Sequence, residues 1–598
     1  MSAQKIAVLL LFATAAFAQK PPVVADPETV VVTGTFTPIP LSEANRAVLS
    51  LNTREHDLLF NSFADYLQLD PSIDLRQRGT DGIQADLSIR GASFGQSLVL
   101  LNGMRINDAQ SAHHNLDIPV PLEAVSSMEV LHGAGSTLYG SDAMGGAVNF
   151  ITAPPPKTEL RARAGLGNFG FNQERIVGSY LGKNWSEQIS ASRDFSTGFR
   201  PDRDYRSSSA SSDTWVKSGL GQSHLLFAGS DRPFGADQFY GSFPSWERTK
   251  SWFASMSQDL GKDTNVDFAY RRHSDEFVLL RDNPSIYENN HISQSWQGAV
   301  RRNSALSNDF KLAYGVDAQG DVIDSNNLGH HSRNRGAGYI NGDFQLLHRV
   351  FLSLGARDEV FTGGRNEFAP SLSGGVFLGR GWKLRASASR AFRLPTYTDL
   401  YYSDPANLGN PLLKPESAWS FEGGPEWNLG GRLSAEATVF HRRERNDIDY
   451  VRSSPSVPWQ ATNIDNLNFT GVEAALRFRL PKSQELNVSY TALHGSQEAL
   501  PGLTSKYVFE YPSQNAVVSW MAEFKTQFAL RTRLGVLQRI EQDPYPLWDF
   551  SFSRTTGWLR PYLQLSNLSN TEYEEIPGVA MPGRSVIGGL EFILSRRP

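Results

Sequence analysis

The sequence predicts a transmembrane antiparallel β-barrel that follows a compact α+β domain. Three observations indicate this fold: a secretion signal at the N-terminus, strand-like alternation of apolar and polar residues over most of the chain, and an unusual composition. The 598 residues include 51 Gly, 35 Phe, 19 Tyr and 12 Trp, but no Cys. A secreted chain that is polar on average, rich in aromatic residues and without long apolar segments is typical of an outer-membrane barrel.

The first 18 residues have the organisation of a secretion signal. Lys5 is followed by an apolar run over residues 6–13, and the small-residue site Ala16-Phe17-Ala18 precedes Gln19. The apolar run is too short to span a bilayer as a helix. We therefore expect residues 1–18 to be removed and the mature chain to begin near Gln19.

A short β-prone run lies in the proline-punctuated tail over residues 19–37. Its residues are Glu28, Thr29, Val30, Val31, Val32, Thr33 and Gly34. The consecutive valines favour an extended chain, but the run is too short and too isolated to form its own sheet. An exposed strand without a partner is a liability unless another protein pairs with it. The run therefore has two interpretations: it is a strand that pairs with another protein, or it is part of a frayed N-terminus.

Residues 38–153 are expected to form the compact α+β domain. Asn61 or Ser62 can cap a short helix from Phe63 to about Leu69. Short strands divided by glycines are expected over residues 87–89, 98–101 and 128–131. Helix and strands together indicate a globule that is distinct from the region after it.

Three prolines at 154–156 separate this globule from period-two alternation over residues 157–592. For example, Leu384, Ala386 and Ala388 alternate with polar residues. Such strands have one apolar face, which meets the core in a soluble sandwich or lipid in a barrel. The number of strands and the secretion signal favour the barrel. The region allows about 20 residues for each of ~22 strands, which fits a plugged outer-membrane transporter.

The end of the chain predicts a closing strand. Val586, Gly588, Leu590 and Phe592 alternate along it. We expect this strand to end at Phe592 and residues 593–598 to form a C-terminal tail. Barrels of this kind usually stop at the aromatic residue, so the tail is a departure from the pattern.

Several ordered motifs make the chain resemble the TonB-dependent outer-membrane transporters. Residues 28–34 are similar to the TonB box of that family, and residues 87–91, 98–103 and 125–152 to its plug signatures. Residues 392–416 resemble the family's FRAPT, DLY and GNP.LKPE block. The resemblance implies a 22-stranded barrel filled by its N-terminal plug. It also implies a transporter, not an enzyme, that is energised by TonB with its inner-membrane motor proteins.

The resemblance further implies a contact between plug and barrel. In the family, Arg90 and an arginine at position 132 commonly pair with barrel glutamates, here Glu416, Glu422 or Glu473. This chain has His132 instead of the arginine. Because a histidine is only partly charged near neutral pH, the contact is expected to be weaker or pH-dependent.

Candidate ligand residues are few. His113 and His114 lie where plug loops of the family face substrate, and a solvated loop is the alternative. Adjacent histidines lack the spacing that converges on one metal ion. Asp447 and Asp449 offer oxygen ligands for calcium in an outer loop, but no fuller ligand set accompanies them. We therefore expect no permanently bound cofactor.

An enzymatic reading rests on residues 91–95, which match the G-x-S-x-G elbow of serine hydrolases. That elbow requires a helix after the serine. Here the β-prone run at 98–101 follows, so a tight turn is the better interpretation.

The size of the chain and its short N-terminal tail resemble cobalamin and ferric siderophore receptors. The expected substrate is therefore a small-molecule chelate that carries cobalt or iron. A porin, adhesin or phage receptor is the competing class, but it leaves residues 28–153 unexplained. We expect a monomer in the lipid of a Gram-negative outer membrane, with its N-terminus in the periplasm. The net charge of −5 argues against nucleic acid as a partner.

Overall fold

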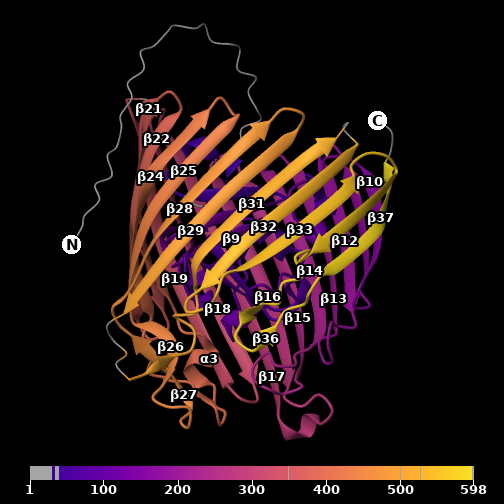
Figure 1. Cartoon of the computed structure of the whole chain (residues 1–598). Coiled ribbons are helices and arrows are strands. Elements are labelled where there is room, and N and C mark those ends of the chain that lie inside the picture. Colours follow the sequence, from indigo (N-terminus) through magenta and orange to yellow (C-terminus); the bar gives the residue numbers. More distant parts are fainter. Residues whose placement is uncertain are drawn as a thin grey trace, which may run out of the picture.

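The computed structural model describes residues 30–31, 33, 39–347, 349–497, 500, 502–524 and 527–595. The predicted signal at residues 1–18 and most of the tail at 19–37 lie outside them. The described chain forms a closed β-barrel whose interior holds the N-terminal domain (Figure 1). The predicted fold class is confirmed. Among these residues, none of the helices has the length and apolar character needed to span a bilayer.

Twenty-two antiparallel strands close the barrel, each hydrogen-bonded to the next. Closure joins the first strand to the last, with Glu159 opposite Ser595. The strands are β10 (Glu159–Gly167), β11 (Asn172–Leu181), β12 (Trp185–Ser196), β13 (Tyr205–Ser218), β14 (Gly221–Gly235), β15 (Trp246–Leu260), β16 (Thr264–Val278), β17 (Glu288–Ser307), β18 (Phe310–Ser325), β19 (Gly329–Leu346), β20 (Val350–Phe361), β21 (Arg365–Gly379), β22 (Trp382–Arg393), β24 (Glu416–Leu429), β25 (Leu433–Arg445), β28 (Leu467–Leu480), β29 (Gln484–Gln497), β31 (Pro512–Phe524), β32 (Phe528–Arg539), β33 (Tyr545–Arg554), β34 (Leu559–Ser566) and β37 (Ser585–Ser595).

The barrel wall is apolar outside and charged inside. In β22, the side chain of Leu384 is on the outer face and 50% exposed, whereas Lys383 and Arg385 are 3% and 2% exposed. The same pattern leaves Phe227, Trp252 and many other large apolar residues exposed on the wall. A soluble sandwich would bury the apolar face, so this arrangement suits a lipid environment.

The two ends of the barrel differ in their connections. One end has short turns, such as residues 430–432 between β24 and β25. The opposite end has long loops with their own structure, in the lower part of Figure 1. In outer-membrane barrels short turns face the periplasm and long loops face outward. The loops contain η7 (Pro284–Ile286), α3 (Tyr397–Tyr401), β23 (Asn407–Leu408), β26 (Asp447–Arg452), β27 (Trp459–Ile464), β30 (Thr504–Ser505), β35 (Glu574–Ile576) and β36 (Val579–Ala580).

The plug is built on a five-stranded sheet of order β3-β8-β9-β6-β7 and a hairpin of β4 and β5. The helix predicted from Phe63 begins after Ser62, which forms a capping box with Asp65, and ends at Leu67. The plug elements are β3 (Val48–Asn52), η2 (Asp57–Leu59), α1 (Phe63–Leu67), β4 (Ile73–Gln77), η3 (Thr80–Gly82), β5 (Ala85–Ile89), η4 (Phe94–Gln96), β6 (Ser97–Leu101), β7 (Met104–Arg105), η5 (Ala112–His114), η6 (Leu122–Ala124), β8 (Ser127–His132), α2 (Ser136–Tyr139) and β9 (Gly146–Ile151), preceded by β1 (Val30–Val31), β2 (Ile39–Pro40) and η1 (Leu41–Glu43).

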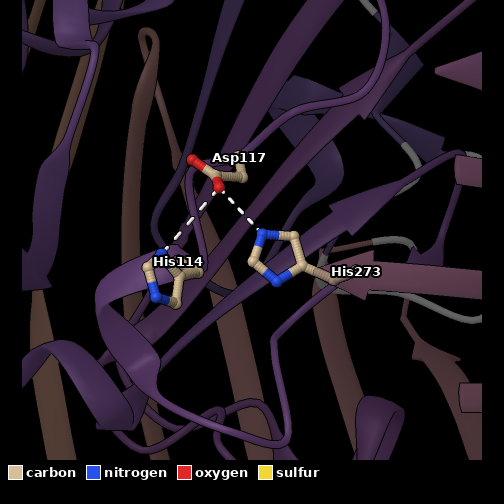
Figure 2. A group of neighbouring side chains, drawn as sticks. All are labelled: His114, Asp117 and His273. Carbon is tan, nitrogen blue, oxygen red and sulfur yellow. Dashed lines mark hydrogen bonds and ion pairs between the residues drawn. The ribbon is translucent and has the colours of Figure 1, made fainter. Parts of the chain in front are cut away.

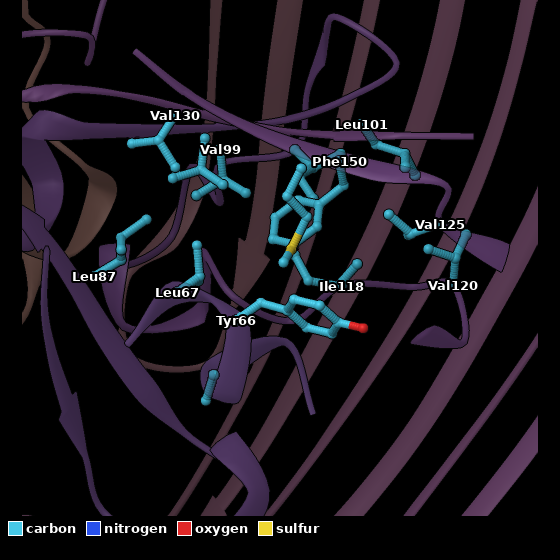
Figure 3. Packing of buried hydrophobic residues seen from close by; sticks show 14 of the residues in the cluster. Tyr66, Leu67, Leu87, Val99, Leu101, Ile118, Val120, Val125, Val130 and Phe150 are labelled. Carbon is cyan, nitrogen blue, oxygen red and sulfur yellow. The ribbon is translucent and has the colours of Figure 1, made fainter. Parts of the chain in front are cut away.

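The helix α1 and the plug sheet share one apolar core. Tyr66 and Leu67 of the helix pack against Val99 and Phe150 of the sheet (Figure 3). The same cluster includes Phe253 of the barrel wall. Burial of this surface stabilises the plug by roughly 25 cal/mol per Å² of apolar area. Plug and wall therefore share part of their core.

The closing strand is longer than predicted. β37 pairs with β10 through Ser595, so the expected boundary at Phe592 is wrong. The backbone of residues 159–161 in β10 is available as a partner for residues 593–595. Only residues 596–598 remain beyond the strand, and they lie outside the described residues.

The β-prone run near the N-terminus does not form an exposed, unpaired strand in its described part. Val30–Val31 pairs with Ile39–Pro40, and the side chains of Val31 and Thr33 are fully buried. The chain doubles back and supplies a partner for its own strand, so the expectation of exposure is wrong here. The remaining members of the run, Glu28, Thr29, Val32 and Gly34, lie outside the described residues.

Thr33 anchors this run to the plug sheet. Its backbone N–H donates to Glu129 Oε2 at 2.6 Å, and Asn149 Nδ2 donates to its hydroxyl at 3.1 Å. Glu129 belongs to β8 and Asn149 to β9. These two hydrogen bonds connect the run directly to β8 and β9.

Candidate functional site

Arg90 fixes the plug to the barrel wall. It follows β5 and has a φ of 53°, a left-handed conformation that turns the chain sharply at the end of the strand. Its Nε and Nη2 donate to the two carboxylate oxygens of Glu473 at 2.7 and 2.5 Å, and its Nη1 donates to Glu422. These glutamates stand on β28 and β24. One plug arginine therefore joins two strands of the wall.

The surroundings of Arg90 exclude water. Its side chain is 2% exposed, and the guanidinium lies 4.5 Å from the ring centroid of Phe440. Arg442 of the wall donates to the carbonyl of Arg90 at 3.1 Å. Removal of one partner from a buried pair of this kind leaves an uncompensated charge, which is strongly destabilising.

His132 does not reach a barrel glutamate. Its Nε2 lies 2.6 Å from Oδ2 of Asp70, which also belongs to the plug. The second plug cation at Glu422 is instead Arg46, whose Nε is 3.5 Å from Glu422 Oε1. Arg46 Nη2 donates to the carbonyl of Ala134 at 2.5 Å, and the adjacent Ala47 accepts from the backbone N–H of His132 at 3.0 Å. We call Arg46, Arg90, Glu422 and Glu473 the plug–barrel ion network.

Glu416 is a plug contact, but with a different partner from the one expected. Its carboxylate accepts from Gln96 of the plug at 3.1 Å and from Arg393 of the wall at 2.7 Å. It also accepts from the backbone N–H of Ile448 at 2.7 Å. Glu416 therefore joins the plug to a loop strand and lies outside the plug–barrel ion network.

An aromatic cup lies at the loop end of the plug, formed by Phe94, His113, Tyr240 and Tyr507. The ring of His113 stacks on Phe94 at 4.5 Å between centroids, and the rings of Tyr240 and Tyr507 approach it at 6.2 and 6.1 Å. The two tyrosines come from barrel loops. Plug apex and loops thus converge on His113.

Asp86 orients the imidazole of His113. Nδ1 of His113 lies 2.7 Å from Asp86 Oδ1. Burial lowers the pKa of His113, and the nearby Asp86 only partly offsets this effect. A neutral imidazole among aromatic rings can stack on a planar ligand or coordinate a metal.

His114 points away from the cup into a buried cluster of charges. Its Nε2 lies 3.3 Å from Asp275 Oδ2 and 4.0 Å from Glu247 Oε1, both on the barrel wall. Its Nδ1 lies 3.9 Å from Asp117, which also contacts His273 at 2.9 Å (Figure 2). Burial alone would lower the pKa of His114, but the attraction of Asp275 and its neighbours outweighs burial and raises the pKa to about 10.

Asp449 holds a loop. Its carboxylate accepts from the backbone N–H groups of Tyr507 and Val508 at 3.1 and 3.0 Å, and from the hydroxyl of Ser505. Asp447 accepts from Gln96. Both carboxylates are thus engaged by the protein, and among the described residues no group of three metal-binding side chains includes either of them.

A small polar hollow lies between the plug and strands β17, β18, β19 and β22. Four arginines line it, and acidic partners hold each of them: Arg105 pairs with Asp142, Arg333 with Asp321, Arg335 with Glu359 and Arg393 with Glu416. Such a lining suits water and polar groups.

Comparison with known proteins agrees with this architecture. The family model described as "TonB dependent receptor-like, beta-barrel" matches residues 154–570, and the "TonB-dependent Receptor Plug Domain" matches residues 42–147. The chain belongs to the TonB-dependent receptor family. It is therefore an outer-membrane transport protein and not an enzyme, as predicted.

Two curated relatives cover most of this TonB-dependent receptor. The "Iron-regulated outer membrane virulence protein" of Vibrio cholerae serotype O1 is 25% identical over 573 residues, which span 86% of this chain and 84% of that protein. The "Vitamin B12 transporter BtuB" of Vibrio vulnificus is 26% identical over 443 residues, 69% of each chain. The crystal structure of the siderophore receptor PirA from Acinetobacter baumannii gives a TM-score of 0.76 at 14% identity, over 92% of this chain and 98% of that one. This last similarity supports the fold alone.

The His132–Asp70 pair predicts a pH dependence inside the plug of this receptor. Burial alone would lower the pKa of His132, but Asp70 outweighs it and raises the pKa above 6.5. Burial alone would raise the pKa of Asp70, but the attraction of His132 outweighs burial and lowers the pKa from 3.8. The histidine's contribution is complete below pH 6.5 and is lost as pH rises through its raised pKa. The aspartate's contribution is present above pH 3.8 and is lost as pH falls through its lowered pKa.

His132→Gln is therefore expected to destabilise the plug by about 2 kcal/mol at pH 5–6, because a charge-assisted hydrogen bond is lost. The difference should shrink at high pH, where the imidazole is neutral. Since the chain has no cysteine, a fluorophore on Glu55→Cys in the plug can report plug unfolding in denaturant. An equal effect of His132→Gln at all pH values would contradict the ion pair.

Proposed function

We propose that this TonB-dependent receptor imports cobalamin or a ferric siderophore across the outer membrane, with energy from TonB and its inner-membrane motor proteins. The observation that carries the proposal is the plug–barrel ion network. It holds the plug inside the barrel through buried ion pairs. A passage can open only if these contacts are broken. We therefore expect transport to require mechanical work and not to occur by passive diffusion.

The proposed binding segment for TonB is residues 28–34. Strand addition at Val30–Val31 would give TonB a row of backbone hydrogen bonds that resists a pull along the strand. The described part of this run is anchored to the plug sheet through Thr33. A pull on it would therefore be transmitted to β8 and β9. A porin or adhesin has no use for such a connection.

The aromatic cup is the proposed outer contact for the substrate. It combines stacking surfaces from the plug and from two loops, which suits a planar ring system or the aromatic groups of a chelator. The curated relatives, an iron-regulated protein and a vitamin B12 transporter, support the same two substrate classes. In this proposal the metal enters with the chelate.

The test is growth of a strain that lacks this receptor on cobalamin and on a panel of ferric chelates as limiting sources. We expect growth on cobalamin or on one chelate class to require the receptor and to be lost when the proton gradient is dissipated. A Phe94→Ala, Tyr507→Ala double variant should reduce uptake at low substrate concentration, whereas Phe227→Ala on the lipid face should not. Equal growth with and without the receptor on every source would overturn the proposal.

A further inference from the structure

A buried cluster of side chains adjoins the aromatic cup, where His114 of the plug faces Glu247 of β15 and Asp275 of β16. We propose that these three residues bind a free divalent transition-metal ion, with Zn²⁺ as the representative ion, and that this ion ties the plug apex to the barrel wall. The inference does not rest on the proposed function, because it concerns a bare ion and not an imported chelate. It goes beyond the sequence analysis, which considered metal ligands only at Asp447, Asp449 and the adjacent histidines.

The donor set and its spacing suit zinc. One imidazole nitrogen and two carboxylate oxygens are ligands that Zn²⁺ accepts, and coordination at Nε2 of His114 releases the proton of that nitrogen to solvent. With bonds of about 2.0 Å, the donors of a tetrahedral site lie roughly 3.3 Å apart. Nε2 of His114 lies 3.3 Å from Asp275 Oδ2, and all three donor atoms lie within 4.8 Å of one another. A small movement of Glu247 completes the set.

Two buried carboxylates of this cluster share one histidine as their basic partner. Glu247 and Asp275 are 1% and 5% exposed. Within the part of the chain that the structure describes, His114 is their only basic partner at ion-pair distance. The neighbouring buried Asp108 and Asp117, in contrast, each have an arginine at 2.7 and 3.2 Å. Buried charges require compensation, and coordination of a cation supplies it.

Hydrogen bonds already orient the proposed ligands. Gln110 Nε2 donates to Asp275 Oδ2 at 2.7 Å, and the hydroxyl of Tyr240 donates to Glu247 Oε2 at 3.0 Å. Asp275 Oδ1 is buried and has no hydrogen-bond partner in the described structure. Asp117 stands behind His114, on the side of Nδ1. Carboxylates behind a ligating histidine and hydrogen bonds to ligating carboxylates are common features of metal sites.

A second group of donors, His114, Asp117 and His273 (Figure 2), is less suited to a metal. Both ring nitrogens of His273 already face carboxylates, Asp108 at 2.8 Å and Asp117 at 2.9 Å. Arg232 also pairs with Asp117. A cation there would displace existing partners and meet a guanidinium. On the Nε2 side of His114 the carboxylates have no arginine partner; their partners there are the neutral amides of Gln110, at 2.7 Å from Asp275 Oδ2, and Gln84, at 3.5 Å from Glu247 Oε1.

Access to the site is through the cup. Tyr240 is 45% exposed and hydrogen-bonds directly to Glu247. In this proposal the ion enters beside this tyrosine, from the loop end. An ion bound there would hold three elements together: η5 of the plug, β15 and β16.

The experiment uses the purified full-length receptor in detergent, stripped with EDTA and then titrated with ZnCl₂. We expect one zinc per receptor by elemental analysis and calorimetry, and a zinc-dependent rise in the midpoint of plug unfolding. His114→Ala and Glu247→Gln should each weaken binding by more than the roughly 10- to 100-fold typical of outer-shell changes. His113→Ala is the matched control, because this adjacent imidazole faces the cup, and it should retain the zinc.

The heat-modifiable migration of the barrel on gels checks that each variant is folded. No zinc above background in the wild-type receptor, or equal zinc in wild type and in folded His114→Ala, would overturn the inference. Tighter binding of Ca²⁺ or Mg²⁺ than of Zn²⁺ would also overturn it. Chelate uptake is measured separately, so failure here leaves the proposed function standing.

Discussion

Arg90→Gln is expected to loosen the plug by about 3 kcal/mol, because it breaks a buried ion network on one side only. Glu473 loses both of its hydrogen bonds, whereas Glu422 keeps the longer contact with Arg46 and a hydrogen bond from the hydroxyl of Ser387 at 3.1 Å. Glutamine has no positive charge but has the same Cβ as arginine, so the strain of the left-handed backbone at position 90 is unchanged. The effect therefore reports the ion pairs and not the turn.

The measurement is a double-mutant cycle on plug unfolding, with the fluorophore on Glu55→Cys. Arg90→Gln, Glu473→Gln and the double variant should give a coupling of roughly 2 kcal/mol, because the second change removes the charge that the first leaves unpaired. The control is Arg193→Gln. Arg193 pairs with Glu174 at 3.5 Å on the exposed surface, where side-chain exposures are 42% and 66%, and its loss should cost at most about 0.5 kcal/mol. Equal effects at Arg90 and Arg193 would refute the role of burial.

The barrel was predictable because its signal is local. Each strand carries period-two alternation that reads directly as a lipid face and an inner face, as Leu384 and Arg385 illustrate. The alternation also continues beyond Phe592 to Leu594, which is 67% exposed on the outer face. The sequence therefore contained the signal for the longer closing strand. The expected boundary at Phe592 falls too early because it follows the rule that an aromatic residue usually ends such chains.

The site was only partly predictable, because its contacts join distant segments. The motifs of the family indicated Arg90 and the barrel glutamates. No local pattern marked Arg46, which reaches Glu422 only because residue 47 runs beside His132 in the plug. Likewise, His114 meets Glu247 and Asp275 across a plug–wall interface that no spacing in the sequence encodes.

The N-terminal run shows a different limit. Its β propensity was read correctly, since Val30–Val31 is a strand. Propensity does not reveal whether a partner strand is already present, and here Ile39–Pro40 supplies one. Under the proposed coupling to TonB, this pairing implies an exchange: the internal partner must leave before TonB can pair with the same backbone groups.

Val31→Pro is therefore expected to abolish energy-coupled uptake. Proline lacks the backbone N–H and cannot donate to a partner strand, whether that strand is Ile39–Pro40 or a segment of TonB. Substrate binding at the loop end should be unchanged, because the cup is built from Phe94, His113 and the loop tyrosines. Val31→Ala is the matched control, since it keeps the N–H and removes only side-chain contacts, and it should retain most of the uptake.

The measurement compares labelled-substrate binding to de-energised cells with uptake by energised cells, at equal receptor levels in the outer membrane. Normal binding with uptake at the level of the receptor-free strain is expected for Val31→Pro. Wild-type uptake by Val31→Pro would show that strand addition at this residue does not drive transport. Loss of both binding and uptake in Val31→Pro, but not in Val31→Ala, would instead show that β1 supports the plug fold. The two readouts thus distinguish a segment that binds TonB from a strand that only stabilises the plug. This distinction is necessary because Val31 is buried.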